Sequence, residues 1–224
     1  QIGFIGCGGI ARQHAAHLSK MRSVQIIAAS DLIIKTAETF SADFDIPLFY
    51  KDYRKILDIS EIDAIWVCTP THQHIQPVVH AASAGKHVFC EKPIALKISD
   101  AKRMLTMCEK YDIKFTVGFV RRFDATWGNF KKIIQSKALG SPIIWRFASG
   151  GKPPHKWFRN IHKGGGPLID GAIHNYDFAL QLFGEVESVQ SSSLKLDDTS
   201  IGADTGSAIL NFKNGHQHTL IWSW

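Results

Sequence analysis

The chain has 224 residues, of which 45% are hydrophobic and 21% are charged, and its formal net charge is +6. This composition is typical of a globular protein with one large core or two modest ones, and no apolar stretch approaches the ~18 residues that would span a membrane. The basic residues are spread along the chain and are not interleaved with aromatic ones, which argues against a nucleic-acid module and favours a mildly basic surface that attracts an anionic cofactor.

A glycine-rich loop follows the first apolar run. Residues 2–5 predict a short buried strand, and Gly6-Cys7-Gly8-Gly9-Ile10-Ala11 after it is a G-x-G-x-x-A fingerprint. The first glycine permits a tight strand-to-helix turn, the second lets the backbone approach a pyrophosphate, and the alanine lets the helix pack closely on the strand. The N-terminus of the predicted helix would therefore hold the phosphates of a dinucleotide.

An acidic residue ends the second apolar run. Residues 24–29 predict a strand that leads to Ser30-Asp31. Asp31 lies about 20 residues after the fingerprint, where a carboxylate accepts hydrogen bonds from the adenosine ribose. The same carboxylate would repel a 2′-phosphate, and no arginine follows it directly, although Lys35 lies nearby. The pattern therefore favours NAD over NADP.

Helices and strands alternate as far as Gly118. We predict helices over residues 36–44, 50–57, 74–83 and 100–109, and strands over residues 64–68, 87–90 and 114–118. Such alternation predicts a parallel, doubly wound sheet. Thr69-Pro70 follows one of these strands and Glu91-Lys92-Pro93 follows the next. Ligands of doubly wound sheets bind outside the C-terminal ends of the strands, so we expect both segments at the dinucleotide crevice.

Beyond Gly118 the pattern becomes that of an α+β domain. We predict a helix over residues 123–136 with Phe130, Ile133 and Ile134 on its inner side, a strand over 143–148 and a loop over 149–167. A helix over 168–183 and strands over 186–196, 204–212 and 216–224 follow, with a hairpin turn at Lys213-Asn214-Gly215. The predicted domains are residues 1–120 and residues 121–224, the second with an open, mostly antiparallel sheet.

The second domain carries a candidate acid/base pair. Asp170 and His174 are four residues apart on one predicted helix, so their side chains would share a face. A histidine beside a carboxylate is a general acid/base whose orientation the neighbour sets. Gly164-Gly165-Gly166 precede the pair and would allow the close approach of a ligand, whereas we interpret Tyr176 and Asp177 as structural.

The loop before this helix has two interpretations. It carries Lys152, His155, Lys156, Trp157 and Arg159. In one interpretation it faces a pocket, where Trp157 would stack on the ring of a ligand and the basic residues would meet an acidic substituent. In the other it is a solvated loop between domains.

The cysteines and histidines do not predict a metal site. Cys7, Cys68, Cys90 and Cys108 show no metal-ligand spacing, and three of them fall on or beside predicted buried strands. We interpret them as reduced thiols, which together with the absence of a visible signal peptide predicts a cytoplasmic protein. His14 and His17 are three residues apart, and we interpret them as a solvated helix side.

Together these motifs resemble the glucose-fructose oxidoreductase / inositol dehydrogenase (Gfo/Idh/MocA) family over essentially the whole chain. The most specific motifs are Ala84-Gly85-Lys86-His87-Val88 running into Glu91-Lys92-Pro93, Gly164-Gly165-Gly166 leading to Asp170 and His174, and Val117-Gly118-Phe119-Val120-Arg121-Arg122-Phe123. The resemblance implies a Rossmann domain followed by a substrate-binding and dimerisation domain. It also implies an NAD(P)-dependent oxidoreductase that acts on a secondary alcohol of a sugar, cyclitol or related polyol.

The resemblance also implies the site residues. Lys92, Asp170 and His174 would be catalytic, with His174 taking the hydroxyl proton, Lys92 stabilising negative charge on oxygen and Asp170 holding His174 or an adjacent hydroxyl. Whether Lys92 or His174 moves the proton stays open. The same three residues and Trp157 are the expected substrate contacts. The expected cofactor contacts are Gly6, Gly8, Gly9, Ile10, Asp31, Thr69, Pro70, His74, Glu91, Lys92 and Arg122.

Family members are longer than this chain, which stops at Trp224 within the expected sheet. We therefore expect part of a longer protein, and a homodimer or homotetramer formed through that sheet, as is common in the family. Two alternatives come from other classes: a dinucleotide-binding regulator without turnover, and a lyase- or glycosidase-like relative that uses NAD transiently. Stoichiometric formation of NADH distinguishes a dehydrogenase from both.

Overall fold

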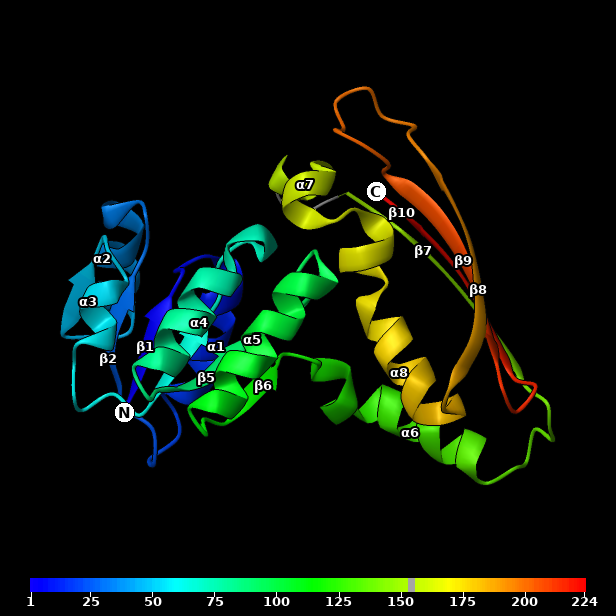
Figure 1. The fold of residues 1–224 in the computed structure, drawn as a ribbon, viewed down its shortest axis with the longest axis horizontal. Coiled ribbons are helices and arrows are strands. Elements are labelled where there is room, and N and C mark those ends of the chain that lie inside the picture. Colours follow the sequence, from blue (N-terminus) through cyan, green and yellow to red (C-terminus); the bar gives the residue numbers. More distant parts are fainter. Residues whose placement is uncertain (153–155) are drawn as a thin grey trace. The chain divides into compact units, whose positions relative to one another are not determined.

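The computed structural model describes residues 1–152 and 156–224 and divides into two compact units, Gln1–Gly118 and Phe119–Trp224. Figure 1 draws the first unit in blue to green and the second in green to red. Each unit has hydrophobic cores of its own, so each is described by itself.

The first unit is a six-stranded parallel sheet with the strand order β3-β2-β1-β4-β5-β6. The order reverses between β1 and β4, which is where doubly wound sheets bind ligands. Its strands are β1 (Ile2–Ile5), β2 (Ile26–Ser30), β3 (Leu48–Tyr50), β4 (Ala64–Val67), β5 (His87–Cys90) and β6 (Phe115–Val117). Its helices are α1 (Gly9–Leu18), α2 (Ile34–Asp43), α3 (Arg54–Leu57), α4 (Ile75–Ser83) and α5 (Ile98–Lys110), with a 3-10 turn at Thr71–Gln73.

Helices cover both faces of this sheet. Side chains of α1 and α2 pack on one face, where Phe4 and Phe40 are fully buried with ring centroids 5.4 Å apart. Side chains of α3, α4 and α5 pack on the other, around Ile65 and Met104; α4 and α5 run side by side in Figure 1. A parallel sheet covered on both faces requires strands that are apolar on both sides, which explains the continuous apolar runs of the sequence.

One strand of the first unit was not predicted. β3 has only three residues, and the helix predicted over 50–57 is confined to Arg54–Leu57. β3 exists because its backbone pairs with Ala28, Ala29 and Ser30 of β2. Its side chains are exposed or half-buried, so no burial pattern marks it in the sequence.

The second unit is a four-stranded sheet with the order β7-β10-β9-β8, in which β7 and β10 are parallel and the other pairs are antiparallel. Helices α6 and α8 pack on one face of it (Figure 1). Its elements are α6 (Ala125–Gln135), β7 (Ile144–Gly150), α7 (Ile161–Gly164), α8 (Ile173–Phe183), β8 (Val186–Leu194), β9 (Thr205–Phe212) and β10 (Gln217–Ser223). Short turns lie at Val120–Phe123, Lys156–Arg159 and Pro167–Gly171. The predicted fold class, a doubly wound parallel sheet followed by an α+β domain, is confirmed.

Three details of the second unit differ from the prediction. The predicted loop over 149–167 contains the 3-10 turn Lys156–Arg159 and helix α7, while residues 153–155 lie outside the described residues. The helix predicted over 168–183 is two elements, because Pro167 opens a π turn in which the Ala172 amide donates to the Pro167 carbonyl (2.9 Å). Ile133, predicted on the inner side of α6, is 49% exposed, and Ile134 is 8% exposed.

The core of the second unit contains a histidine. His218 is fully buried on β10, its ring stacks on Trp145 at 3.9 Å, and its Nδ1 lies 3.1 Å from the Trp145 carbonyl oxygen. Burial lowers the pKa of His218, because the charged imidazolium loses its hydration in this aromatic core. The folded state therefore holds His218 neutral.

We expect the second unit to lose stability as the pH falls below about 6.5, the pKa of an unperturbed histidine. Below that pH the unfolded chain binds a proton at His218 that the folded state does not, so the free energy of unfolding falls by up to about 1.4 kcal/mol per pH unit. Urea unfolding between pH 5 and 8, followed by tryptophan fluorescence, measures this, since every tryptophan except Trp66 lies in the second unit. His218→Phe should flatten the dependence; an unchanged slope would contradict the assignment.

Candidate active site

The glycine loop joins the C-terminal end of β1 to α1. Gly6 has φ +90°, and a Cβ placed on it would lie 2.8 Å from the Cys68 carbonyl carbon and oxygen and from the Thr69 nitrogen. Only glycine fits such a position. Among the described residues no heavy atom lies within 4 Å of a Cβ placed on Gly8 or Gly9. The loop is thus closed against β4 and open at the N-terminus of α1, which is the arrangement that accepts a phosphate group.

Asp31 lies beside this loop, directly after β2. Its carboxylate accepts the backbone N–H of Cys7 in the glycine loop (3.0 Å) and that of Ile33 (2.9 Å). Each carboxylate oxygen thus accepts one donor and retains a lone pair for a further one. Leu32 and Ile33 after it are each 66% exposed, so the surface next to the carboxylate is apolar.

The segment after β4 is held by a buried histidine. His74, immediately before α4, is 1% exposed. Its Nε2 lies 2.8 Å from the Thr69 carbonyl oxygen and its Nδ1 3.0 Å from the Pro93 carbonyl oxygen. Burial lowers the pKa of His74, so the ring is neutral at pH 7. Both ring nitrogens are therefore directed at the protein backbone.

Lys92 lies two residues after β5. The Glu91 amide still donates to Val67 of β4 (2.9 Å), so the sheet fixes the chain up to this point. The Glu91 carboxylate accepts the Lys92 amide (3.0 Å) and the Nε2–H of His14 on α1 (2.7 Å). Glu91 is buried and Lys92 is half-buried. Within the first unit, the structure thus brings Lys92 to the same edge of the sheet as the glycine loop.

The second unit contains the other two residues of the expected catalytic set. Asp170 is buried in the π turn, and His174 lies in the first turn of α8. Asp170 thus belongs to the π turn that precedes α8, and His174 belongs to α8 itself. A Cβ on Gly171 would lie 2.4 Å from the indole nitrogen of Trp222, so the glycine lets this turn pack directly on β10.

Arg122 and Asp177 form an ion pair in the second unit. Arg122 Nε donates to Asp177 Oδ2 (2.9 Å), and a second guanidinium nitrogen donates to Oδ1. The guanidinium lies over the Phe119 ring at 5.2 Å, and the edge of that ring packs on the His174 imidazole with centroids 6.3 Å apart. Arg122, an expected cofactor contact, is therefore paired with Asp177, which we interpret from the sequence as structural.

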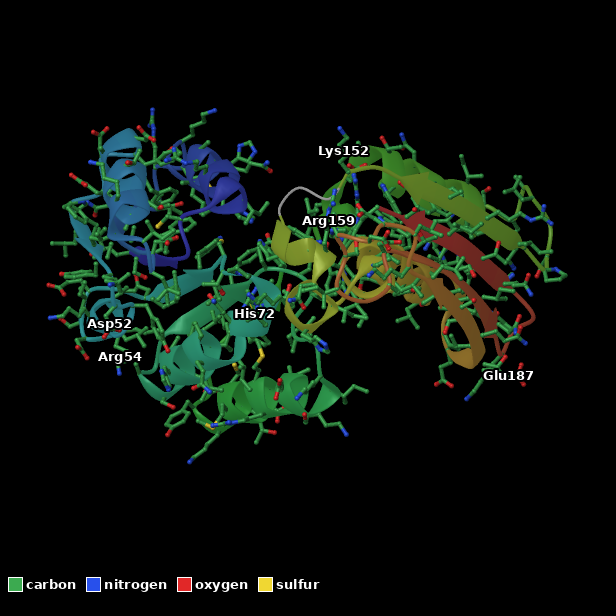
Figure 2. All side chains as sticks on the ribbon, turned by 90° about the horizontal axis from the view of Figure 1, so that it is seen from above. Asp52, Arg54, His72, Lys152, Arg159 and Glu187 are labelled. Carbon is green, nitrogen blue, oxygen red and sulfur yellow. The ribbon has the colours of Figure 1, made fainter. Side chains whose placement is uncertain are left out.

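The predicted pocket loop is partly described. Trp157 is half-buried and stacks on Phe158 at 3.7 Å, while Lys152 is exposed. Arg159, labelled in Figure 2, pairs with Asp197 (2.8 Å) and Thr199. His155 lies outside the described residues, and the 3-10 turn begins at Lys156. Arg159 therefore binds a loop of its own unit. Asp52 and Arg54, also labelled in Figure 2, form a separate ion pair in the first unit.

The cysteines near the site are unreactive. All four lie in the described ranges as free, buried thiols. Burial raises the pKa of Cys7 to about 12 and places those of Cys68 and Cys90 well above the ordinary value. A thiolate is therefore not available as a nucleophile beside the glycine loop. Residues 1–152 and 156–224 contain no cluster of three metal-ligating side chains and no helix long and apolar enough to cross a membrane.

Two family models account for nearly the whole chain. Residues 1–119 match the oxidoreductase family with an NAD-binding Rossmann fold, and residues 127–224 match the Gfo/Idh/MocA C-terminal domain. The chain belongs to the Gfo/Idh/MocA oxidoreductase family. The predicted family membership is thereby confirmed, and the glycine loop described above is that of an NAD-binding fold.

Named relatives of this Gfo/Idh/MocA chain include inositol dehydrogenases. It is 33% identical to the myo-inositol 2-dehydrogenase of Thermotoga maritima over 96% of this chain, and 31% identical to the inositol 2-dehydrogenase of Rhizobium meliloti over 97%. It spans 66% of the length of each relative. The crystal structure of myo-inositol 2-dehydrogenase from Lactobacillus plantarum superposes with a TM-score of 0.89 at 27% identity, covering 98% of this chain and 68% of that one.

Two residues that the sequence placed outside the candidate site contact residues expected in it. His14 contacts Glu91, 77 residues away, and Asp177 contacts Arg122, 55 residues away. His14 lies three residues after Ala11 of the fingerprint, on the helix expected to hold phosphates, but nothing in the local sequence indicates its partner. The His14 contact is visible only when α1 and the segment after β5 are placed side by side.

Proposed function

We propose that the protein is a nicotinamide-dependent dehydrogenase that oxidises a secondary alcohol of a cyclitol, sugar or related polyol, with NAD as the hydride acceptor. The observation that carries this is the position of Lys92, which emerges at the C-terminal end of β5, at the same sheet edge as the open glycine loop after β1. The inositol dehydrogenases among the relatives support a polyol substrate.

The first domain, residues 1–120, binds the dinucleotide in this proposal. Gly6, Gly8, Gly9 and Ile10 meet the phosphates, Asp31 accepts the ribose hydroxyls, and Thr69, Pro70 and Glu91 complete the lining. When bound, the oxidised nicotinamide accepts a hydride from the hydroxyl-bearing carbon. An open N-terminus of α1 and a carboxylate with free lone pairs support this fit.

The second domain, residues 121–224, binds the substrate in this proposal. His174 takes the hydroxyl proton while the carbon–oxygen bond becomes a carbonyl, and Asp170 orients His174 or an adjacent hydroxyl. The Lys92 ammonium stabilises the negative charge that develops on the substrate oxygen. Trp157 offers an aromatic face to the ring. The exposed side chains of the sheet, such as Val189 and Ile221, support a homodimer or homotetramer, and the four free thiols support a cytoplasmic location.

A spectrophotometric screen of the full-length protein tests the proposal. NAD and NADP are each offered with a panel of inositols, aldoses and related polyols, and reduction is followed by the absorbance of the reduced nicotinamide. Reduction with one cyclitol or sugar would support the dehydrogenase and name its substrate. Tight NAD binding without reduction on any substrate would favour the regulator or the enzyme that uses NAD transiently.

Asp31→Ala should weaken NAD binding by about 10- to 100-fold, the range expected when a hydrogen bond to a charged group is lost. It should also narrow the preference for NAD over NADP, because the repulsion of a 2′-phosphate is removed. Titration of each cofactor against intrinsic fluorescence measures both effects. Asp31→Asn keeps the shape and one acceptor oxygen and should separate the loss of charge from the loss of the contact. An unchanged preference in both variants would contradict the ribose assignment.

A further inference from the structure

Lys92 belongs to a segment without regular secondary structure. The chain leaves the sheet after Cys90 and does not become helical until Ile98. Lys92 therefore lies between β5 and α5 and belongs to neither. A side chain that must be placed to within about half an ångström requires support from neighbouring residues. Two histidines, one from α1 and one preceding α4, supply contacts on either side of it.

His14 holds the residue before Lys92. Its Nε2 lies 2.7 Å from Glu91 Oε1, and because a carboxylate only accepts, the Nε2 carries the proton. Glu91 Oε2 in turn accepts the Lys92 amide at 3.0 Å. The His14 ring is fixed by an edge contact with Phe89 at 5.0 Å. The hydrogen bonds thus run from α1 through a buried carboxylate to the peptide of Lys92.

The glycine at the end of β6 tightens this contact. A Cβ on Gly118 would lie 3.0 Å from Glu91 Oε1 and 3.1 Å from the Phe89 ring. Gly118 thus leaves room for the Glu91 carboxylate in the place where a larger residue would have to displace it.

His74 holds the residue after Lys92. Its Nδ1 lies 3.0 Å from the carbonyl oxygen of Pro93 and 3.3 Å from that of Ile94, and its Nε2 lies 2.8 Å from that of Thr69. All three partners are acceptors, and a neutral imidazole has a single N–H. The His74 ring therefore donates to a carbonyl of one segment and packs against the carbonyl of the other. The ring thus joins the segment after β4 to the segment after β5.

We propose that His14 and His74 are positioning residues that fix Lys92 relative to the two loops expected to hold the dinucleotide. His14 ties Lys92 to the helix of the glycine loop, and His74 ties it to Thr69. Neither histidine reaches the reacting atoms in this assignment, which rests on the proposed dehydrogenase function. Because the error tolerated in placing a reacting group is small, loosening either contact lowers turnover more than it lowers cofactor affinity.

The test compares His14→Leu and His14→Gln in the full-length protein. Leucine lacks the donor, whereas the glutamine amide nitrogen can occupy the place of Nε2. We expect His14→Leu to lower kcat by 10- to 100-fold with the NAD dissociation constant within threefold of wild type, and His14→Gln to recover most of the loss. His17→Gln, an exposed position on the same helix, should match wild type. A wild-type kcat in His14→Leu, or equal losses in the leucine and glutamine variants, would overturn the proposal.

A second measurement does not depend on catalysis. Amide hydrogen exchange of the protein without cofactor reports directly on the bond between the Lys92 amide and Glu91. We expect faster exchange at Lys92 in His14→Leu and at Ile94 and Thr69 in His74→Gln, with amides of β1 unchanged. Unchanged exchange at Lys92 would overturn the positioning role. If exchange at Lys92 were faster in His14→Leu but the wild-type protein reduced no cofactor with any substrate, the positioning role would stand and the dehydrogenase function would be rejected.

Discussion

Lys92→Ala should lower kcat for polyol oxidation by about 10²- to 10⁴-fold, the range usual for the loss of a positioned acid/base or electrostatic group. The ammonium is removed from the place where negative charge develops on the substrate oxygen, and water does not replace it in a fixed orientation. The glycine loop and Asp31 are untouched, so the NAD dissociation constant should stay within a fewfold of wild type. Initial rates and a cofactor titration on the same preparations give both values.

Lys97 provides the matched control for this prediction. It lies at the end of the same segment, is exposed, and precedes α5. Lys97→Ala should therefore leave both kcat and NAD affinity unchanged. Lys92→Arg keeps the positive charge but replaces a compact ammonium with a planar fork, and should recover only part of the rate. If Lys92→Ala lost NAD binding in proportion to its loss of rate, Lys92 would be a cofactor ligand without a catalytic role.

Gly6→Ala should destabilise the first unit by about 3 kcal/mol or more and abolish NAD binding. An L-residue at positive φ costs about 1–2 kcal/mol, and overpacking of a closed site adds about 1–3 kcal/mol. The new Cβ would lie 2.8 Å from backbone atoms of Cys68 and Thr69, which a side-chain rotation cannot relieve. β1 and β4 would have to separate at the edge that we expect to hold the cofactor. Urea unfolding and NAD titration measure the two effects.

Gly8→Ala separates the steric requirement of the fold from that of the ligand. A Cβ at this position meets open space in the protein, so the free energy of unfolding should change by less than about 0.5 kcal/mol. The methyl group would nevertheless stand where the backbone must approach a pyrophosphate, so NAD binding should weaken strongly. Unaltered NAD affinity in Gly8→Ala would place the phosphates elsewhere.

The local sequence predicted those parts of the candidate site whose conformation depends on steric contacts between neighbouring residues. The turn at Gly6, the close packing of Ala11 and the acid at the end of β2 are set by neighbours in one strand–helix–strand unit. The structure gives Gly6 the positive φ that the fingerprint implies. Asp31 lies against the glycine loop because a parallel sheet places the ends of β1 and β2 side by side.

The second unit was less predictable because its irregular parts depend on contacts between distant segments. The π turn at Pro167–Gly171 packs on Trp222 of β10, and Arg159 is held by Asp197 and Thr199. A pattern of apolar residues over 168–183 indicates a helix but cannot indicate the wider turn, whose spacing is set by what it packs against. Asp170 therefore lies in a π turn that the apolar pattern alone did not predict.

The sequence by itself determined the family and the doubly wound sheet, because these depend on short motifs and on the periodicity of burial; the catalytic set is what the family resemblance implies, and it stays a prediction. Only the tertiary structure decided that His14 contacts the buried Glu91, whereas the sequence placed it on a solvated side of its helix. The structure alone also showed that both ring nitrogens of His74 face backbone carbonyls. The physical reason is the range of the interactions. Backbone sterics act over a few residues, whereas a hydrogen bond between α1 and the segment after β5 forms only once the sheet has brought them together.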